Sequence, residues 1–349
     1  MDKEVAVSTN KEELYQAVED LCLHKSGPIV YENLSAVCKS LIEARINILS
    51  SQTSLDHGSY LQAVESVWSH HCEMMQTIRN IFLYLDRSYA MHQQNQLTAN
   101  SVLILMICDM GNHHFKQHLS LRKDIEDRIV LALLAAVRVD RESNSPRFSF
   151  QEAQLNNGGT AATVSAAATV NAAGGIVDYG VLRSCCRMLQ CLGLYETKFE
   201  PCLVQESMSF FALESQDLLS TDHAGEGSSV ALTGVPSAAP GAMSAAAAQY
   251  YLYHVDFRMA QVGAMVSRYL VFECSRYSLI RVIENSLLAP IHTSLVIDSG
   301  LSALLTAHAV SDVSKLYNLL SRLGGSTAAG SSGGGIVQAL CGQWGAYIR

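Results

Sequence analysis

Histidine side chains are the ones in this sequence whose type and spacing come nearest to a metal site. In HHFKQH, His114 and His118 lie four residues apart, so on a helix they would share one face. A zinc hydrolase of this pattern also needs a glutamate beside the first histidine as general base, and Phe115 holds that position. We therefore favour surface or partly buried histidines here over a metal-dependent hydrolase.

Two other clusters carry metal-binding or redox-active residue types. WSHHCE offers His70, His71 and Cys72, but adjacent residues of a helix point about 100° apart and chelate poorly. RSCCRMLQC contains three cysteines without a C-x-x-C pair, so neither a zinc site nor a redox motif is indicated. We expect those three to be core residues; they are Cys185, Cys186 and Cys191.

The motifs of common enzyme classes are missing from the sequence. The glycine clusters match neither G-x-x-x-x-G-K-[ST] nor G-x-G-x-x-G between a strand and a helix, so no nucleotide site is predicted. No serine sits in G-x-S-x-G, and no pair of carboxylates is spaced as an acid and base couple. The prediction is a protein without cofactor or catalytic residues.

Composition narrows the partners and the compartment. The chain has 349 residues, 49% of them apolar, and carries 24 basic against 32 acidic residues with no Lys/Arg-rich run, which argues against direct nucleic-acid binding. No apolar run reaches the roughly 18 to 20 residues that cross a bilayer, and no signal peptide is recognisable. We expect a protein of the cytoplasm and nucleus. Cysteines that occur singly in apolar helical patterns should be reduced and buried, namely Cys22, Cys38, Cys72 and Cys274.

Helical periodicity runs through nearly every ordered stretch, so the predicted fold class is all-α. The first helix should begin at a capping box of Thr9 and Glu12. The second should begin near Pro28. The expected core positions of the first three helices are Leu14, Val18 and Leu21, then Val30, Leu34, Val37 and Leu41, then Leu61, Val64 and Trp68.

Three segments rich in Gly, Ala and Ser interrupt this helical pattern. They span residues 143–174, 221–248 and 324–335. Their composition offers little apolar surface to bury, so we expect disordered insertions between helices, in which the alanines could form short helical turns.

The stretch IRNIFLYLDRSYAMHQ, residues 78–93, has more large apolar residues than one buried face can use. At 100° per residue a narrow core-facing stripe collects Ile78, Ile81, Phe82, Leu85 and Tyr89. On the opposite side lie Leu83, Tyr84 and Met91, around Asn80 and Arg87. A second contact surface is therefore predicted on this helix.

Several of these segments together resemble one protein family, the cullins. The resemblance is carried by EELYQAVEDLCLHK, LQAVESVWSHHCEMMQTIRNIFLYLDRSYAM, CDMGNHHFKQHL, LRSCCRMLQCLGLYETKFEPCLVQESMSFFALES, YLYHVDFRMAQ, LLTAHAVSDVSKLYNLLSRL and ALCGQWGAYI. Their order and spacing match as well, and the first segment together with IFLYLDRSYA looks most like the cullin-4 branch. The resemblance covers nearly everything outside the three insertions.

This resemblance implies an elongated stalk of tandem five-helix cullin repeats. The first repeat would span 8–122 and lack its usual first helix, and the second would span 123–248 with the insertions 143–174 and 221–248. The third would be incomplete, spanning 249–349 with the insertion 324–335.

Cullins are non-catalytic scaffolds of ubiquitin ligases in ubiquitin-dependent protein catabolism. The resemblance implies that the first repeat binds an adaptor carrying a substrate receptor, and in the cullin-4 branch this adaptor resembles damaged-DNA-binding protein 1, a triple WD40-type propeller. A RING-box protein would be a partner only if a C-terminal half exists beyond this chain. The chain is then expected to be either a fragment or a truncated cullin that competes for the adaptor.

Adaptor contacts in cullins come from the second and fifth helices of the first repeat, which correspond here to residues 10–24 and 77–93. Carried over, the candidate adaptor-binding residues are Lys11, Glu12, Tyr15, Leu83, Tyr84, Arg87, Ser88 and Met91. Lys11 departs from the family pattern, which usually has an apolar residue there. The alternative is that Tyr84 and Met91 pack under a neighbouring loop or on the missing first helix.

A different class of protein remains open beside the cullins. Helical-repeat tethers of vesicle trafficking also stack helices, and in such a protein the second apolar face would bind coiled-coil partners or a second copy. Cross-linking mass spectrometry in cell extract separates the two, since one predicts a propeller adaptor and the other predicts coat or tether subunits.

Overall fold

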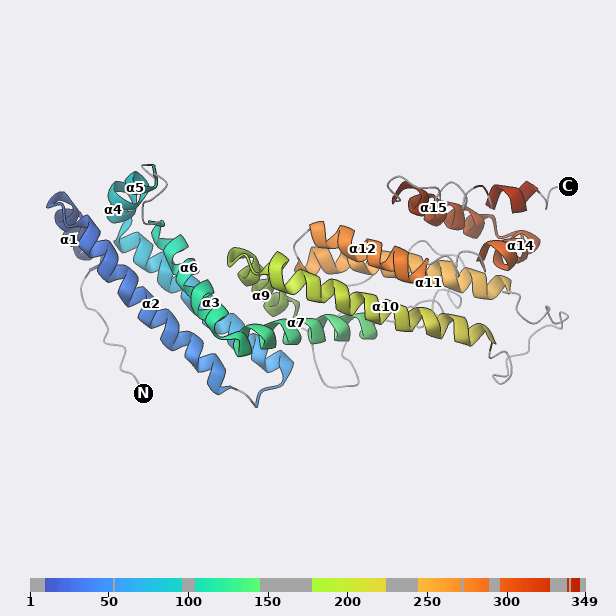
Figure 1. Cartoon of the computed structure of the whole chain (residues 1–349), viewed down its shortest axis with the longest axis horizontal. Coiled ribbons are helices and arrows are strands. Elements are labelled where there is room, and N and C mark those ends of the chain that lie inside the picture. Colours follow the sequence, from blue (N-terminus) through green and yellow to red (C-terminus); the bar gives the residue numbers. More distant parts are fainter. Residues whose placement is uncertain are drawn as a thin grey trace. The chain divides into compact units, whose positions relative to one another are not determined.

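The computed structural model describes residues 10–52, 54–95, 104–144, 178–223, 244–270, 273–288, 296–326, 338 and 340–345. Over these residues the chain forms helices, turns and short connections, and no strand occurs among them (Figure 1). The all-α prediction is confirmed for this part of the chain. The N-terminal helices are α1 (Lys11–Leu23), α2 (Gly27–Ser51), α3 (His57–Ile81), α4 (Leu83–Leu85), the π-helix η1 (Asp86–Ala90), α5 (Met91–Asn95), α6 (Ile107–Leu121), α7 (Lys123–Ser143), α9 (Tyr179–Cys191) and η2 (Tyr195–Phe199).

Two compact units make up the chain. The first contains residues 1–138 and 177–199, and the second contains 139–176 and 200–349, so the boundary falls inside α7. The helices of the second unit are α10 (Glu200–His223), α11 (Ala245–Met265), η3 (Val266–Leu270), α12 (Glu273–Leu287), η4 (Val296–Gly300), α14 (Leu301–Thr306) and α15 (Val310–Ser326). The division into three repeats stays a prediction.

Three helices of the first unit begin at a short polar side chain that caps them. Asn10 caps α1, and its side chain accepts a hydrogen bond from the Glu12 amide. The predicted capping box of Thr9 and Glu12 is therefore wrong, because asparagine is an equally good cap and the helix begins one residue later. Asp56 caps α3 and Asp178 caps α9, each accepting from two backbone amides.

The core of the first unit is apolar and forms where α1, α2, α3, α4 and α6 meet. Its buried members include Val18, Leu34, Cys38, Met75, Leu85, Ile107 and Met110. The predicted positions Leu61, Val64 and Trp68 on α3 are buried, as expected. Trp68 meets Phe115 of α6 edge to face, with ring centroids 5.3 Å apart.

Helix α2 turns a different face to this core than the sequence predicted. The buried series runs through Leu34, Cys38, Ile42, Ile46 and Leu49. The expected core residues Val37 and Leu41 are exposed, and Val30 is half-buried. The prediction was wrong because α2 is apolar over more than one face, so its spacing fits two stripes equally well.

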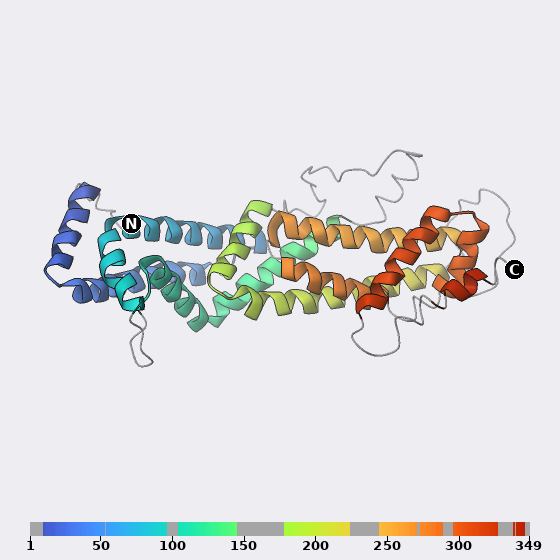
Figure 2. The same cartoon turned by 90° about the horizontal axis from the view of Figure 1, so that it is seen from above.

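In the second unit α10, α11 and α12 run alongside one another (Figure 2). Apolar side chains such as Leu203, Phe211, Leu252 and Ile283 are buried there. The same core also encloses charged groups. Arg141 is fully buried, and its guanidinium donates to Glu206 at 2.8 Å and to the Ser207 hydroxyl at 2.6 Å.

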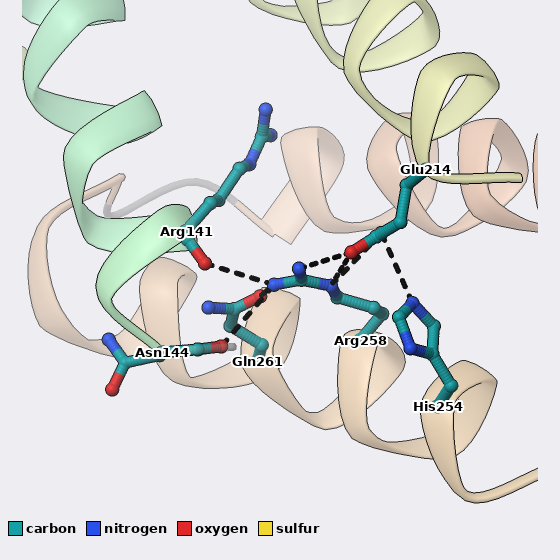
Figure 3. Close-up of polar contacts among 6 residues, drawn as sticks. All are labelled: Arg141, Asn144, Glu214, His254, Arg258 and Gln261. Atoms are coloured by element: carbon teal, nitrogen blue, oxygen red, sulfur yellow. Dashed lines mark hydrogen bonds and ion pairs between the residues drawn. The ribbon is translucent and has the colours of Figure 1, made fainter. Parts of the chain in front are cut away.

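A second buried arginine joins the end of α7 to α10 and α11. Figure 3 shows the Arg258 guanidinium between the Glu214 carboxylate and the last residues of α7. Arg258 Nε donates to both Glu214 oxygens at 3.2 and 3.1 Å, and its Nη1 donates to the backbone oxygens of Arg141 and Asn144. His254 Nε2 lies 3.3 Å from Glu214 Oε2. The network satisfies charges that burial would otherwise penalise heavily.

The predicted insertions lie mostly outside the described residues, namely 145–174, 224–243 and 327–335. Their edges are helical: α10 continues to His223, and α15 continues to Ser326. The alanines at 245–248 form the first turn of α11, whose Ser244 cap accepts from the Ala247 amide. The helical turns expected in the alanine runs are therefore present at 245–248. The second predicted insertion, 221–248, is helical at both of its edges.

The cysteines divide into buried and exposed groups, and those described are all free thiols. Cys38, Cys185 and Cys186 are buried, as predicted, and Cys22 is half-buried. The prediction was wrong for Cys72 and Cys191, which are exposed, because each lies at the edge of an apolar stripe and not within it. The side chain of Cys274 lies outside the described residues.

Candidate functional site

The histidine candidates take part in packing within the first unit. His114 Nε2 hydrogen-bonds the Ser35 hydroxyl at 2.9 Å, and His118 is buried. His71 is also buried, stacks on Trp68 and contacts Asn112, while burial lowers its pKa. Among the described residues no three His, Cys, Asp or Glu side chains are grouped as metal ligands.

The two segments expected to form a docking surface are neighbours in the first unit, since α1 packs on α4. The prediction of a single helix over 77–93 is wrong, because several shorter helices make up this segment. Residues 77–81 end α3, Phe82 leaves the helical conformation at φ −96° and ψ 23°, and the chain resumes as α4, η1 and α5. The break lets the segment turn away from α3 (Figure 1).

The inner side of this segment is the predicted core stripe. Leu85 is fully buried, and Ile78, Ile81, Phe82 and Tyr89 are partly buried against the same apolar cluster. The Tyr89 ring lies 5.8 Å from the Tyr31 ring of α2. This half of the sequence interpretation is confirmed.

We call the eight predicted adaptor-binding residues the docking face. Four of them, Lys11, Glu12, Arg87 and Ser88, are exposed, and Met91 has half of its surface exposed (50%). Tyr15, Leu83 and Tyr84 are half-buried. All eight keep surface accessible. The face combines tyrosine, methionine and arginine, which are enriched at protein interfaces, with lysine, glutamate and serine, which are depleted there.

Ser88 ties the two halves of the docking face together. Its hydroxyl donates to the Tyr84 carbonyl at 2.6 Å, one helical turn earlier. It also hydrogen-bonds the Cys22 thiol near the end of α1, where burial raises the thiol pKa and this bond partly offsets the rise. Helix α1 and η1 are thus joined by a polar contact as well as by packing.

A buried carboxylate fixes the docking segment to α6, and the sequence interpretation missed it. Asp86, the first residue of η1, is almost fully buried, and its Oδ1 accepts from the Ile107 amide at 2.9 Å. Ile107 begins α6, so Asp86 caps that helix from another segment. Arg79 adds an ion pair with Asp86 Oδ2 at 3.7 Å. The sequence signal for this role is that Asp86 directly follows Leu85 of the core stripe.

Two leucines near the end of α1 also escaped the sequence interpretation. Leu21 was predicted to be in the core, yet it is exposed, because the face of α1 that meets the core passes through Val18 and Cys22. Leu23 is 62% exposed and lies three turns after Glu12 on the same side of α1. Leu23 therefore adds an exposed apolar side chain to the side of α1 that carries Glu12, and its helical spacing from Glu12 is visible in the sequence.

Helix α1 ends immediately after these leucines in a left-handed turn. Lys25 has φ 62°, and the Ser26 amide donates to the Leu21 carbonyl while the Lys25 amide donates to Cys22. This is a Schellman motif, in which glycine usually holds the left-handed position. At the end of α9 the same pair of bonds is made with Gly193 in that position.

No helix among the described residues is long and apolar enough to cross a membrane. Helix α1 carries two pairs of acidic residues, Glu12 with Glu13 and Glu19 with Asp20.

Comparison with known proteins identifies the family. The model of the cullin α-solenoid domain matches residues 2–231 and 237–339. Human Cullin-4A is 28% identical over 344 residues, covering 99% of this chain and 35% of that protein. Cullin-4 of Dictyostelium discoideum is 26% identical over 91% of the chain and 32% of its own length, and Cullin-3 of Caenorhabditis elegans is 24% identical over 94% and 35%. The chain spans about a third of the length of these relatives. Since the domain model covers nearly the whole sequence, the chain belongs to the cullin family.

Proposed function

We propose that this chain is the N-terminal scaffold region of a cullin-RING ubiquitin ligase subunit and docks a substrate-receptor adaptor through the docking face. One observation carries the proposal: a single short segment anchors itself with Leu85 and Asp86 while leaving Tyr84, Arg87 and Met91 accessible. Such a segment presents a preformed surface, so an adaptor would not have to order it on binding.

The role proposed for the rest of the chain is non-catalytic. In a ubiquitin ligase a scaffold holds the adaptor-bound substrate near the ubiquitin-charged enzyme, and a fixed separation raises the effective concentration of one near the other. A RING-box protein would bind a C-terminal half of the kind found in complete cullins. The pathway we propose is ubiquitin-dependent protein catabolism, in the cytoplasm and nucleus.

The proposed partner is a propeller adaptor similar to damaged-DNA-binding protein 1. Similarity to cullin-4 relatives supports this choice over the adaptors of other branches. The docking face would supply Tyr84 and Met91 as apolar anchors and Arg87 as a rim cation, a mixture common among residues that dominate binding energy. Direct contact with nucleic acid or membrane is not part of the proposal.

Charge substitutions on the docking face test the proposal. The double variant Tyr84→Glu with Met91→Glu should lose co-purification with the propeller adaptor, because two buried and unpaired carboxylates would oppose association. Circular dichroism should remain helical, since both side chains lie outside the core cluster. A matched control is Leu121→Glu, which changes another exposed leucine of the first unit and should bind normally.

The outcomes are distinct. Unchanged adaptor binding by the double variant would rule out the docking face. Loss of helical signal would instead show that Tyr84 or Met91 packs in the interior, as the alternative from the sequence holds.

Lys11 provides a finer test of partner choice. The side chain is exposed at the start of α1, where cullins usually have an apolar residue. Lys11→Leu should strengthen adaptor binding, because it removes the cost of desolvating an ammonium group. Weaker binding would indicate that the adaptor of this chain contributes an acidic partner for Lys11.

A further inference from the structure

Two histidines of the first unit lie at the contacts that α6 makes with α2 and α3. His114, on α6, hydrogen-bonds the Ser35 hydroxyl of α2 through Nε2 at 2.9 Å. His71, on α3, has its Nε2 3.3 Å from the Asn112 side-chain oxygen of α6. One imidazole therefore joins α6 to α2, and the other joins α6 to α3.

His71 is enclosed by aromatic rings and by closely packed helices. Its ring stacks on Trp68, with centroids 5.3 Å apart, and lies 4.8 Å from the Phe115 ring of α6. A Cβ on Gly111 would lie 2.6 Å from Met75 Cε, so α6 and α3 touch directly beside it. Because His71 is only 4% exposed, a positive charge on its ring would be largely cut off from water.

Each imidazole has a hydrogen-bond partner for one ring nitrogen only. Within the described part of the chain, Nδ1 of His71 and Nδ1 of His114 are buried without a partner. A neutral imidazole can leave one nitrogen without a proton, whereas a protonated imidazole has two N–H donors. Protonation would therefore bury an N–H group without an acceptor at each contact, which costs free energy.

The surroundings of His114 also oppose a positive charge. Burial lowers the pKa of His114 most, and His113, Lys39 and His118 lower it further. His113 and His118 lie on α6 itself, and Lys39 comes from α2. Each of these neighbours can carry only positive charge, so none of them would stabilise a protonated ring.

The surroundings of His71 act in the same direction. Burial lowers the pKa of His71 most, the hydrogen bond with Asn112 opposes this, and His70 lowers the pKa further. His70 can carry only positive charge, and Asn112 is neutral. Both imidazoles are therefore kept neutral where they are packed.

Helix α6 also holds the docking segment in place. Its first residue, Ile107, donates its amide to the buried carboxylate of Asp86, which begins η1. Arg87 and Ser88 of the docking face directly follow Asp86. A displacement of α6 would break this cap and loosen the residues that follow it.

We propose that His71 and His114 form a proton-sensitive clamp, in which protonation of the two rings releases α6 from α3 and α2 and loosens η1 through Asp86. A released histidine takes up a proton at the ordinary pKa of about 6.5, whereas the packed histidine does so only at lower pH. The released state therefore binds protons more tightly than the packed state. The contacts of α6 are complete above pH 6.5 and weaken as the pH falls from there through the lowered pKa values.

Hydrogen exchange followed by mass spectrometry on the full 349-residue chain tests the clamp. The pH is lowered from about 7.5 to about 5.5, a range in which histidine titrates and ordinary carboxyl groups do not, and the rates are corrected for the intrinsic pH dependence of exchange. Peptides from α6 and η1 should lose protection as the pH falls, while those from α2 and α3 keep theirs.

Neutral substitutions assign the effect to the two rings. His71→Gln together with His114→Gln keeps a hydrogen-bonding side chain at each position but takes up no proton, so it should abolish the pH-dependent loss of protection in α6. His71→Phe, which keeps a ring against Trp68, should remove part of that loss. The matched control is His57→Gln, because His57 is exposed on α3 of the same unit, and it should behave like wild type.

Three results would overturn the clamp. The first is constant protection of α6 in the wild-type chain over this pH range. The second is an equal loss in α2, α3 and α6, which would mean that acid unfolds the whole unit and does not release one helix. The third is an unchanged pH dependence in the double variant. The chain is measured without an adaptor, so none of these outcomes depends on the proposed function.

Discussion

The interiors of the two units hold buried charge in different ways. Beneath the docking face the buried carboxylate of Asp86 accepts from a backbone amide, within a core of apolar side chains such as Leu85 and Met75. In the second unit the ends of α7, α10 and α11 meet around Arg141, Arg258 and Glu214. Apolar cores tolerate small shifts, whereas a paired charge network fixes one arrangement because every misplaced partner leaves a buried charge unsatisfied.

The two units should differ in which substitutions damage them. The core cluster of the first unit is held by contacts between apolar side chains. The second unit depends on long-range polar contacts, such as those between Arg258 and Glu214, which lie 44 positions apart. The loss of stability in the first unit should increase with the side-chain volume that a substitution removes. In the second unit it should increase with the buried charge that a substitution leaves unpaired.

The largest effect is expected from breaking the charge network. Arg258→Met should lower the free energy of unfolding of the second unit by about 3 to 5 kcal/mol, since Glu214 and two backbone oxygens would lose their donor. Hydrogen exchange followed by mass spectrometry would locate the loss in α10 and α11.

Two further variants complete this test. Adding Glu214→Leu to Arg258→Met should recover much of the loss, because the unpaired charge is removed. Arg276→Met, which disrupts only a surface pair with Glu273, should change stability by less than about 1 kcal/mol. Equal effects of Arg258→Met and Arg276→Met would contradict the claim that burial makes the Arg258 network sensitive.

A cavity in the apolar core comes next. Leu85→Ala should cost about 2 to 5 kcal/mol, because Leu85 is fully buried below the docking face. Urea denaturation followed by the fluorescence of Trp68, which is buried in the same unit, measures the loss. Met91→Ala is the control, and its half-exposed side chain should be worth about 0.5 kcal/mol or less.

Acid should destabilise the second unit through Glu214. Burial by itself raises the pKa of Glu214, but hydrogen bonds from His254 and Arg258 outweigh it together and hold the pKa below the ordinary value of 4.5. The unfolded chain then binds the proton more tightly, so stability is complete above pH 4.5 and is lost as the pH falls through the lowered value. Thermal melts of Glu214→Gln should show less of this acid dependence, and Glu273→Gln should behave like wild type.

The smallest expected effect concerns the left-handed turn that ends α1. Lys25→Gly should stabilise the first unit by about 1 kcal/mol, because glycine adopts φ 62° without the strain of a side chain. Gly193→Ala, at the equivalent position after α9, should destabilise by a similar amount. Opposite signs in thermal melts would show that local backbone strain, in addition to packing, limits the stability of the first unit.

Helical periodicity in the sequence predicted the buried faces that depend only on the spacing of residues along one helix. The core stripe of residues 78–89 and the buried face of α3 follow from spacing alone. The leftover apolar residues of that segment predicted a second contact surface, while the eight residues of the docking face came from the resemblance to cullins and stay a prediction. Periodicity failed for Val37 and Leu41, because α2 has more apolar residues than its buried face can hold. It also could not pair Asp86 with α6 or Arg258 with Glu214, since those contacts join residues that only the fold brings together.

The π-helix η1 provides a way for the docking face to change by deletion of a single residue. A π-helix holds one more residue per turn than an α-helix, so deleting a single residue from Asp86–Ala90 would restore regular α-helical hydrogen bonding. The extra residue of a π-turn is accommodated within that turn, so α5 would keep nearly its present orientation relative to α4 after the deletion. Leu85 would keep its place in the core, and Met91 would stay on its present side. The deletion would change only the residues of η1 itself, among them Arg87 and Ser88, so the polar part of the docking face could vary while its apolar anchors stay fixed.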